Sequence, residues 1–196
     1  MPLIRECVVT TLHPSGEPHL APLGLIEDGE HWIVAPFRPS TTLANLEKTP
    51  KATASFIDDA EIFAGFVTGK RDWPIEAVSA WPAPRLEAAL AHAELEVRRI
   101  EPDALRPRFI CAVRRIENHK PFLGMNRARA AVLEAAILAT RLHLLPREKI
   151  EREIDYLKIA IDKTAGDAER RAWARVMEKI GAALPSPRER GADGAG

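Results

Sequence analysis

The chain has 196 residues, of which 46% are hydrophobic and 29% are charged, a composition typical of a soluble globular protein and unlike that of a disordered or fibrous chain. Its 28 basic and 28 acidic residues cancel, so bulk charge favours neither a nucleic-acid partner nor a membrane surface. No apolar run approaches the roughly 20 residues that a membrane span needs, and Glu6 argues against an N-terminal signal peptide. Two cysteines suit a reducing compartment. We expect a cytoplasmic protein.

Short runs rich in Val, Ile, Thr and Phe, separated by turn residues, dominate the N-terminal part of the chain. We expect six strands there, over residues 4–12, 19–26, 32–37, 51–57, 94–100 and 108–116. Pro22 and Pro36 cannot donate ladder hydrogen bonds, so each is expected at a bulge or an edge. A short helix is expected over 40–48, with Ser40 or Thr41 as its cap.

Hairpin signals between these strands favour a small closed antiparallel barrel over a parallel sheet. Residues 73–84 hold two Trp and three Pro and are expected to form a packed loop, and residues 85–92 a short helix. The fold class predicted is therefore mainly β with α: a six-stranded antiparallel split barrel followed by a helical domain. We expect a barrel domain, a C-terminal helical domain and a disordered tail over 1–123, 124–184 and 185–196.

After Asn126 the apolar residues follow the helical period. A first helix is expected over 128–145, ending at Pro146, which favours the first turn of the next helix. That second helix carries one apolar stripe, and Gly166 ends it. Asp167 is expected to cap a third helix. The stripe residues of the two later helices are Ile150, Ile154, Leu157, Ile161, Trp173, Val176 and Ile180.

One candidate site is the segment 37–46, where a strand end opens into the short helix. Ser40, Thr41 and Thr42 place three hydroxyls at a helix N-terminus, and Arg38 adds positive charge just before them. Backbone N–H groups and the helix dipole favour an anion at such a place, so the segment is suited to a phosphate. The alternative is an ordinary helix cap beside a solvated arginine.

A second candidate is the start of the first C-terminal helix, at Asn126 and Arg127. Arg127, Glu134 and Arg141 are seven residues apart and therefore lie nearly in line on one side of the helix. This row is either a line of buried or interfacial ion pairs or a solvated face. The spacing alone leaves both interpretations open.

The other reactive side chains show no pattern that indicates catalysis. Asp58 and Asp59 are adjacent at a strand end and would point to opposite faces, so a turn is expected, with one Asp bonding nearby backbone. The six histidines lack metal-ligand spacing, and no metal site is expected. Cys7 and Cys111 stand among apolar residues on predicted strands, and we expect them to be buried and inert.

The order of several short motifs resembles one protein family. The motifs are VTT at 9–11, APLG at 21–24, STT-x-x-NL at 40–46, DD-x-x-x-F at 58–63, NRA at 126–128 and EAAI-x-ATR at 134–141. Their arrangement is similar to the FMN-binding split-barrel flavoproteins, which include pyridoxamine-phosphate-oxidase-like and flavin-reductase-like proteins. It resembles more closely the family called domain of unknown function 447 (DUF447). The resemblance covers about residues 4–180.

This resemblance implies a two-fold homodimer with FMN bound between the subunits. The isoalloxazine ring would rest on the second and third strands, and the phosphate on the segment after the third strand. That segment here has hydroxyl residues in place of the usual cations, so Arg38 or Arg127 would supply the countercharge. The cofactor-binding residues implied are Pro22, Leu23, Gly24, Ala35, Pro36, Phe37, Arg38, Ser40, Thr41, Thr42, Asn45, Asn126 and Arg127.

The function implied is that of an FMN-dependent oxidoreductase, which passes electrons from a reduced nicotinamide or similar donor to a small-molecule acceptor. The flavin carries such chemistry, while the protein binds and orients it. Two alternatives stay open: a non-catalytic flavin-binding or storage protein, and a scaffold whose helical domain binds a protein partner. No nucleic-acid or membrane partner is expected.

Overall fold

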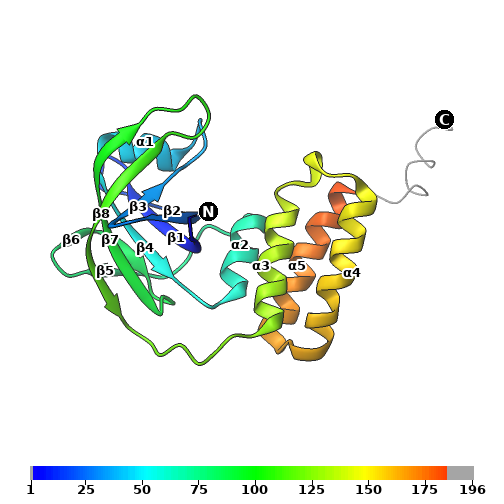
Figure 1. Ribbon diagram of the computed structural model, residues 1–196. Helices are drawn as coiled ribbons and strands as arrows, with labels where there is room; N and C mark the ends of the chain where they lie inside the picture. Colours follow the sequence, from blue (N-terminus) through cyan, green and yellow to red (C-terminus); the bar gives the residue numbers. More distant parts are fainter. Residues whose placement is uncertain (1, 185–196) are drawn as a thin grey trace. The chain divides into compact units, whose positions relative to one another are not determined.

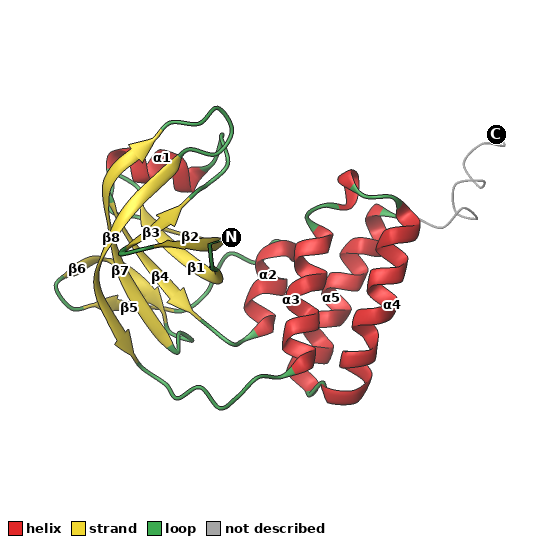
Figure 2. Cartoon of the chain, in the orientation of Figure 1, coloured by secondary structure: helices red, strands yellow, loops and turns green. Residues whose placement is uncertain are grey.

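The computed structural model describes residues 2–184, and in it the chain forms two compact units (Figure 1). One unit comprises the chain up to Asp58 together with Asp72–Leu123, and the other comprises Asp59–Arg71 together with the chain from Gly124 onward. The first unit consists mainly of strands and the second of helices (Figure 2). None of the helices in the described part of the chain combines the length and the apolar character that crossing a bilayer requires.

Six strands of the first unit close into a barrel, in which every neighbouring pair is antiparallel. This confirms the predicted fold class. The order around the barrel is β1-β2-β3-β8-β7-β4. The short helix α1 (Thr41–Lys48) connects β3 to β4. The barrel strands are β1 (Ile4–Leu12), β2 (Pro18–Asp28), β3 (His31–Val34), β4 (Lys51–Phe56), β7 (Ala91–Glu101) and β8 (Arg108–Asn118).

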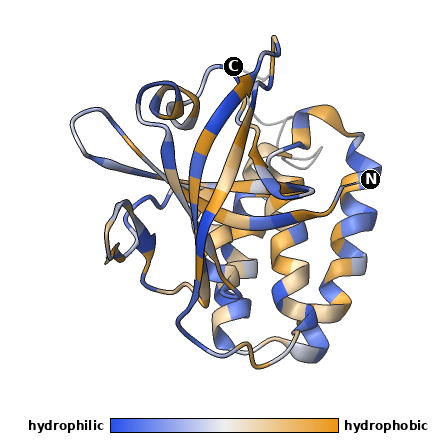
Figure 3. Cartoon of the chain, turned by 60° about the vertical axis from the view of Figure 1, so that its left-hand side comes forward, coloured by the Kyte–Doolittle hydropathy of each residue, from blue (hydrophilic) through white to orange (hydrophobic). Residues whose placement is uncertain are grey.

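Alternate side chains of the strands fill the barrel interior, as the two-residue period of a strand requires. Val9, Leu95 and Phe109 are among the residues fully buried in it. In Figure 3 hydrophobic and hydrophilic residues accordingly alternate along the strand ribbons. This interior packing accounts for the agreement between the predicted and observed strands.

A two-stranded hairpin covers part of the outer face of the barrel. Its strands are β5 (Ile75–Val78) and β6 (Trp81–Leu86), so the prediction of a packed loop over residues 73–84 is wrong. Pro82 and Pro84 argued against a strand, but neither takes part in the register pairs between β5 and β6. Two side chains of β4 fasten the hairpin: Thr53 Oγ1 donates to a backbone carbonyl of β6 at 2.6 Å, and Ser55 Oγ accepts a backbone N–H at 3.0 Å.

The helix predicted over residues 85–92 is also wrong. These residues form the end of β6, a turn and the start of β7. The Ala- and Leu-rich sequence favours a helix locally, but Leu86 and His92 are each 1% exposed. Burial of these side chains in the tertiary structure therefore overrides the local preference for a helix.

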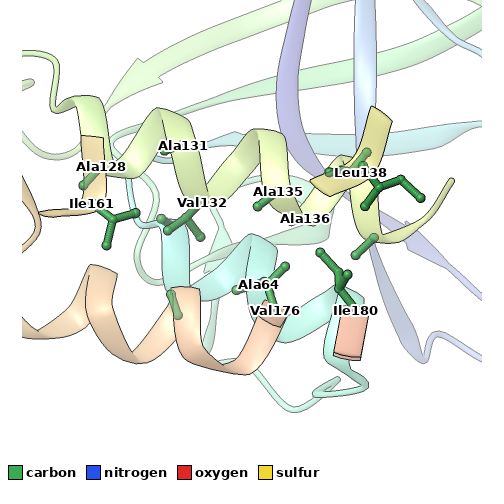
Figure 4. Close-up of a cluster of buried hydrophobic side chains, with 14 residues drawn as sticks. Ala64, Ala128, Ala131, Val132, Ala135, Ala136, Leu138, Ile161, Val176 and Ile180 are labelled. Carbon is green, nitrogen blue, oxygen red and sulfur yellow. The ribbon is translucent and has the colours of Figure 1, made fainter. Parts of the chain in front are cut away.

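The helical unit contains α2 (Ala60–Thr68), α3 (Arg127–Ala139), α4 (Arg147–Thr164) and α5 (Asp167–Ala183). Small and branched side chains from these helices form one apolar cluster, and Figure 4 shows that those of α2, α3 and α5 point toward one another. The predicted stripe residues of α4 and α5 all belong to this cluster or pack against it. Helix α2 was not foreseen, and the expected boundary at residues 123/124 left it with the barrel.

Helix ends in this unit differ from expectation in two places. The first C-terminal helix ends at Ala139, not at residue 145, and a short 3-10 turn, Leu142–Leu144, follows. Gly166, not Asp167, is the N-cap of α5, and its N–H donates to the Glu169 carboxylate at 3.0 Å. The expected disordered tail lies outside the described residues.

Buried His92 and Glu94, with half-buried His119, form a polar cluster on the outer face of the barrel. His92 and Glu94 of β7 are 1% and 7% exposed, and they share a face with Ser55, the register partner of His92 on β4. His92 Nδ1 lies 2.7 Å from His119 Nε2. Burial lowers the pKa of both imidazoles, and a nearby positive charge (His119 for His92, Arg85 for His119) lowers it further.

We predict that mild acid destabilises the protein through this pair. In the unfolded chain the imidazoles bind protons near their ordinary pKa of about 6.5, whereas in the folded protein they bind them only at lower pH. The free energy of unfolding should therefore fall as the pH is lowered from about 7 to about 5. Urea unfolding at a series of pH values measures this, with the His92→Asn, His119→Asn double variant as comparison. A variant as pH-dependent as the parent protein would contradict the assignment.

Candidate functional site

The ladder between β2 and β3 is short, and we call the unpaired region beyond it the opening. Three register pairs join these strands, and the last is Ile26 with Ile33. The rest of β2, back to Pro18, pairs with β1 alone. If the ladder between β2 and β3 continued in the same register beyond Ile26 and Ile33, residues 22–24 would lie opposite residues 35–37. The two stretches predicted to lie beside the flavin ring are therefore those that border the opening.

Proline and glycine account for the geometry at this opening. Pro22 and Pro36 have no N–H to donate, so they cannot extend the ladder. Pro22 lies on the stretch of β2 that has only one strand neighbour, which confirms the predicted edge position, and Pro36 follows the end of β3. A Cβ at Gly24 would stand 2.8 Å from the side chain of Ile4, so glycine permits the close approach of β1 at this place.

The segment that leaves β3 is held by the loop between β7 and β8. The Arg106 guanidinium donates to the Ala35 carbonyl from Nε at 3.2 Å and from Nη2 at 3.0 Å. It also lies over the Phe37 ring, 4.5 Å from the ring centroid, at a distance that favours a cation–π interaction. The Arg38 N–H donates to the Leu105 carbonyl at 2.9 Å. These contacts fix the backbone on one side of the opening.

Arg106 was missed by the sequence analysis. It lies in the loop PDALRP between two predicted strands, and nothing in that local pattern separates an arginine that contacts a strand from a solvated one. The loop is closed by Asp103, whose Oδ1 accepts the N–H groups of Arg106 at 2.6 Å and of Leu105 at 2.8 Å. These bonds lower the pKa of the Asp103 carboxyl. An Asp after a Pro favours a turn, and the pair Pro102-Asp103 is the local sequence feature that indicates this loop.

Helix α1 gives the predicted phosphate residues different surroundings. Ser40 is the N-cap, and its Oγ accepts the backbone N–H of the third helical residue at 3.3 Å. The Thr41 side chain is exposed, whereas Thr42 is 3% exposed. Asn45 is buried as well, and its Nδ2 donates to Thr11 Oγ1 of β1 at 3.1 Å. Ser40 thus has the capping role that the sequence left open as an alternative. Asn45 has a buried structural contact that the sequence did not indicate, and Thr41 presents the exposed hydroxyl.

Several positive groups gather at the start of α1. The first N–H groups of a helix have no intrahelical acceptor, and here they belong to Thr41 and Thr42. Arg38 precedes them, is exposed, and lies 3.5 Å from the Glu47 carboxylate. An exposed pair of this kind contributes little to stability, so the Arg38 guanidinium is available to an anion. With Arg106 of the β7–β8 loop bound to the neighbouring segment, this end of the barrel favours a negatively charged ligand.

In the helical unit, Asn126 is the N-cap of α3. Its Oδ1 accepts two backbone N–H groups of the first turn at 2.8 and 3.1 Å, and its Nδ2 donates to the Thr164 carbonyl at 3.1 Å. Arg127, Glu134 and Arg141 are exposed and, within residues 2–184, form no ion pair with one another. Because α3 ends at Ala139, Arg141 lies beyond the helix, and of the two interpretations the solvated face is the one that fits Arg127 and Glu134.

The remaining candidates have structural surroundings. The Asp59 carboxylate accepts the Glu61 N–H at 2.8 Å and caps α2, which confirms the expected bond to nearby backbone. Cys7 and Cys111 are buried and free, and burial raises the pKa of each thiol to about 12, so both are unreactive at neutral pH. No group of three or more metal-ligating side chains occurs in the described part of the chain.

Comparison with solved structures finds an FMN-bound DUF447 protein of Methanosarcina mazei, with 25% identity and a TM-score of 0.77 over 91% of this chain and 96% of that chain. The styrene monooxygenase flavin reductase of Pseudomonas putida S12 has 15% identity and a TM-score of 0.51, over 60% and 82% of the two chains. The 2-nitrobenzoate 2-nitroreductase of Pseudomonas fluorescens has 15% identity and a TM-score of 0.51, over 61% and 66%. The last two share the fold.

No functionally curated protein matches the sequence at a significant level. Two stretches of the chain match one family of proteins of unknown function: residues 5–120 match its N-terminal domain, and residues 126–178 match a second domain. The first match alone spans more than half of the chain, and the chain therefore belongs to the DUF447 family.

Proposed function

We propose that this protein is an FMN-binding flavoprotein and an oxidoreductase, which passes electrons from a reduced nicotinamide or similar donor to a small-molecule acceptor. The observation that carries the proposal is the opening between β2 and β3, bordered by residues 22–24 and 35–37 and followed by the positive end of α1. The FMN-bound relative from Methanosarcina mazei supports it, because the similarity extends over 91% of this chain.

The residues at the opening fit both parts of FMN. The stretch of β2 without a second strand neighbour leaves backbone groups for a flat polar ring, and Arg106 holds the facing segment in place. The N–H groups and Thr41 hydroxyl at the start of α1, with Arg38, suit a phosphate. FMN, when bound, supplies hydride and electron transfer. The protein's part is to bind, orient and shield the ring.

Turnover distinguishes this proposal from a flavin-storage role. Purified protein loaded with FMN is mixed with NADH or NADPH and a panel of small acceptors, and the oxidation of the nicotinamide is followed. The proposal expects steady turnover that depends on bound FMN. Flavin binding without turnover would favour the storage protein, and a failure to bind flavin at all would favour the scaffold.

The free thiols of Cys7 and Cys111 support a cytoplasmic location.

We predict that the protein binds FMN more tightly than riboflavin by at least about tenfold, because a charge-assisted hydrogen bond to the phosphate contributes roughly 1.5–3 kcal/mol. Thr41→Ala should reduce this preference by removing an exposed hydroxyl at the helix start. Thr49→Ala, at the other end of α1, is the matched control. Calorimetric titration measures the affinities. Equal affinities for the two flavins would contradict a phosphate site at this helix.

Two arginines of the barrel unit are expected to act differently. Arg38→Gln should weaken FMN binding by about tenfold and leave riboflavin binding unchanged, since the proposal places the exposed guanidinium beside the phosphate, which riboflavin lacks. Arg106→Gln should weaken both flavins, because Arg106 holds the backbone and ring of the segment at the opening. The same titrations measure both. If Arg106→Gln leaves riboflavin affinity intact, the segment does not need this support.

The predicted role of Arg127 is tested in the same assay. Arg127→Ala should raise the FMN dissociation constant about tenfold and change the free energy of unfolding by less than about 1 kcal/mol, because the exposed side chain has no ion-pair partner on its helix. Arg141→Ala, an exposed arginine just beyond the C-terminal end of α3, is the matched control. An unchanged dissociation constant would leave Arg38 as the better candidate for the phosphate.

We also predict a homodimer with the flavin at the subunit interface. Phe37 and Leu105, on the two segments beside the opening, are 54% and 58% exposed, and a second subunit would remove such apolar side chains from water. Light scattering at micromolar concentration should give twice the 21.7 kDa chain mass. A stable monomer that still binds FMN would separate the flavin site from the interface and overturn this prediction.

A further inference from the structure

The His92–His119 pair leads to a second site in the barrel unit. His119 lines a shallow cavity of about 550 Å³, together with Leu90, Ala91, Asn118, Lys120, Pro121 and Phe122. These residues lie where β7 begins and β8 ends, whereas Arg106 lies in the loop at the opposite ends of the same two strands. Because each strand has eleven residues, the two places are roughly 30 Å apart. Residues 22–24 lie at the level of His92, because Pro22, Val8, Ser55 and His92 follow one another in register. They are three strands away from it around the barrel, so the cavity is a different place on the barrel from the opening proposed for FMN.

The cluster constrains where the protons of its histidines lie. One proton lies between His92 Nδ1 and His119 Nε2, which are 2.7 Å apart. On its other side, His92 Nε2 faces Glu94 Oε1 at 3.8 Å. Neither of these two buried atoms has a hydrogen-bond partner within residues 2–184. Their separation of 3.8 Å is too long for a hydrogen bond, so the interaction between them is electrostatic.

The carboxylate selects one tautomer of each ring. A neutral imidazole carries its proton on one nitrogen and a lone pair on the other. If the Nε2 lone pair of His92 faced the Glu94 oxygen, two acceptors would oppose each other where water does not screen them, so the proton of His92 belongs on Nε2. His92 Nδ1 then accepts the Nε2–H of His119. This leaves the Nδ1 lone pair of His119, which no group in the described residues binds, as an acceptor at the cavity.

The surrounding charges favour the neutral state of both rings. Arg85 of β6 and Arg115 of β8 oppose the protonation of His119, whereas Glu117 and Glu76 favour it. Arg115 already pairs with Glu117, and Arg85 with Glu76. Within each pair the effects of the arginine and the glutamate on His119 oppose each other. Burial is therefore the main cause that keeps both rings uncharged at neutral pH.

The lining of the cavity indicates what kind of molecule would use this acceptor. Leu90, Pro121 and Phe122 offer apolar surface, and Phe122 is 61% exposed. Lys120 Nζ donates to the Glu87 carbonyl at 3.0 Å, and an ammonium has two further N–H groups to donate. An apolar ring with an acidic hydroxyl would therefore place its O–H against the His119 acceptor and its oxygen near a positive charge.

We propose that this cavity is a binding site for small phenol-like weak acids, in which His119 accepts the ligand hydroxyl and the buried His92–Glu94 pair holds His119 in the required tautomer. His119 contacts the ligand, whereas His92 and Glu94 are positioning residues. The site does not depend on the FMN assignment. Protein with and without FMN can be tested, and a failure of either proposal leaves the other standing.

The first test reads the tautomers directly. Long-range proton–nitrogen NMR spectra of the full chain at neutral pH should show His119 and His92 both protonated at Nε2. Glu94→Gln, whose amide oxygen still accepts, should keep this pattern, and Glu94→Leu should lose it. If Glu94→Leu does not fold, the parent protein decides by itself. A His119 protonated at Nδ1 in the parent protein would overturn the proposal.

The second test uses 4-nitrophenol as the probe. Titration should give saturable shifts of the backbone signals of residues 118–122, and His119→Phe, which keeps an aromatic ring without the acceptor, should weaken the affinity by about tenfold. His143→Phe, on the helical unit, is the matched control and should bind as the parent does. Shifts that do not saturate, or an equal affinity of the His119→Phe variant, would overturn the proposal.

Discussion

The early end of the ladder between β2 and β3 is the constraint on which the candidate site depends. Three register pairs are enough to close the barrel, and beyond them Pro22 and Pro36 have no N–H with which to continue. The backbone of β2 is consequently left with one neighbour just where the chain turns from β3 into α1. Arg106 matters because it holds the far side of this gap, which no ladder supports.

Much of this architecture could be predicted, because it follows from local patterns. The barrel strands alternate apolar residues with a period of two, the later helices show a period near 3.6, and the motif order identifies the DUF447 family. The failures have a common physical origin. The hairpin of β5 and β6 and the start of β7 owe their conformation to burial against β4, and no local preference of an Ala- and Pro-rich stretch contains that information.

The same distinction applies to the site. Which stretches border the opening could be predicted, since residues 22–24 and 35–37 belong to recognisable motifs and strands. What holds them could not, since Arg106 is distant in the sequence and lies in an ordinary loop. Hydroxyl residues at a helix start are ambiguous for a further reason: Ser40 and Thr42 resemble ligands in the sequence, but one caps the helix and the other is buried.

Helix α2 is synthesised well before the helices against which it packs. The ribosome releases it after β4, before the strands β7 and β8 that complete the barrel, whereas its packing partners α3 and α5 emerge last. Its apolar side chains are therefore without their final neighbours during most of translation, a period in which such surfaces attract chaperones or aggregate. For the same reason, truncation at residue 123 would not yield the barrel unit by itself. The fragment would retain α2 but lose the helices that bury Ala60 and Ala64.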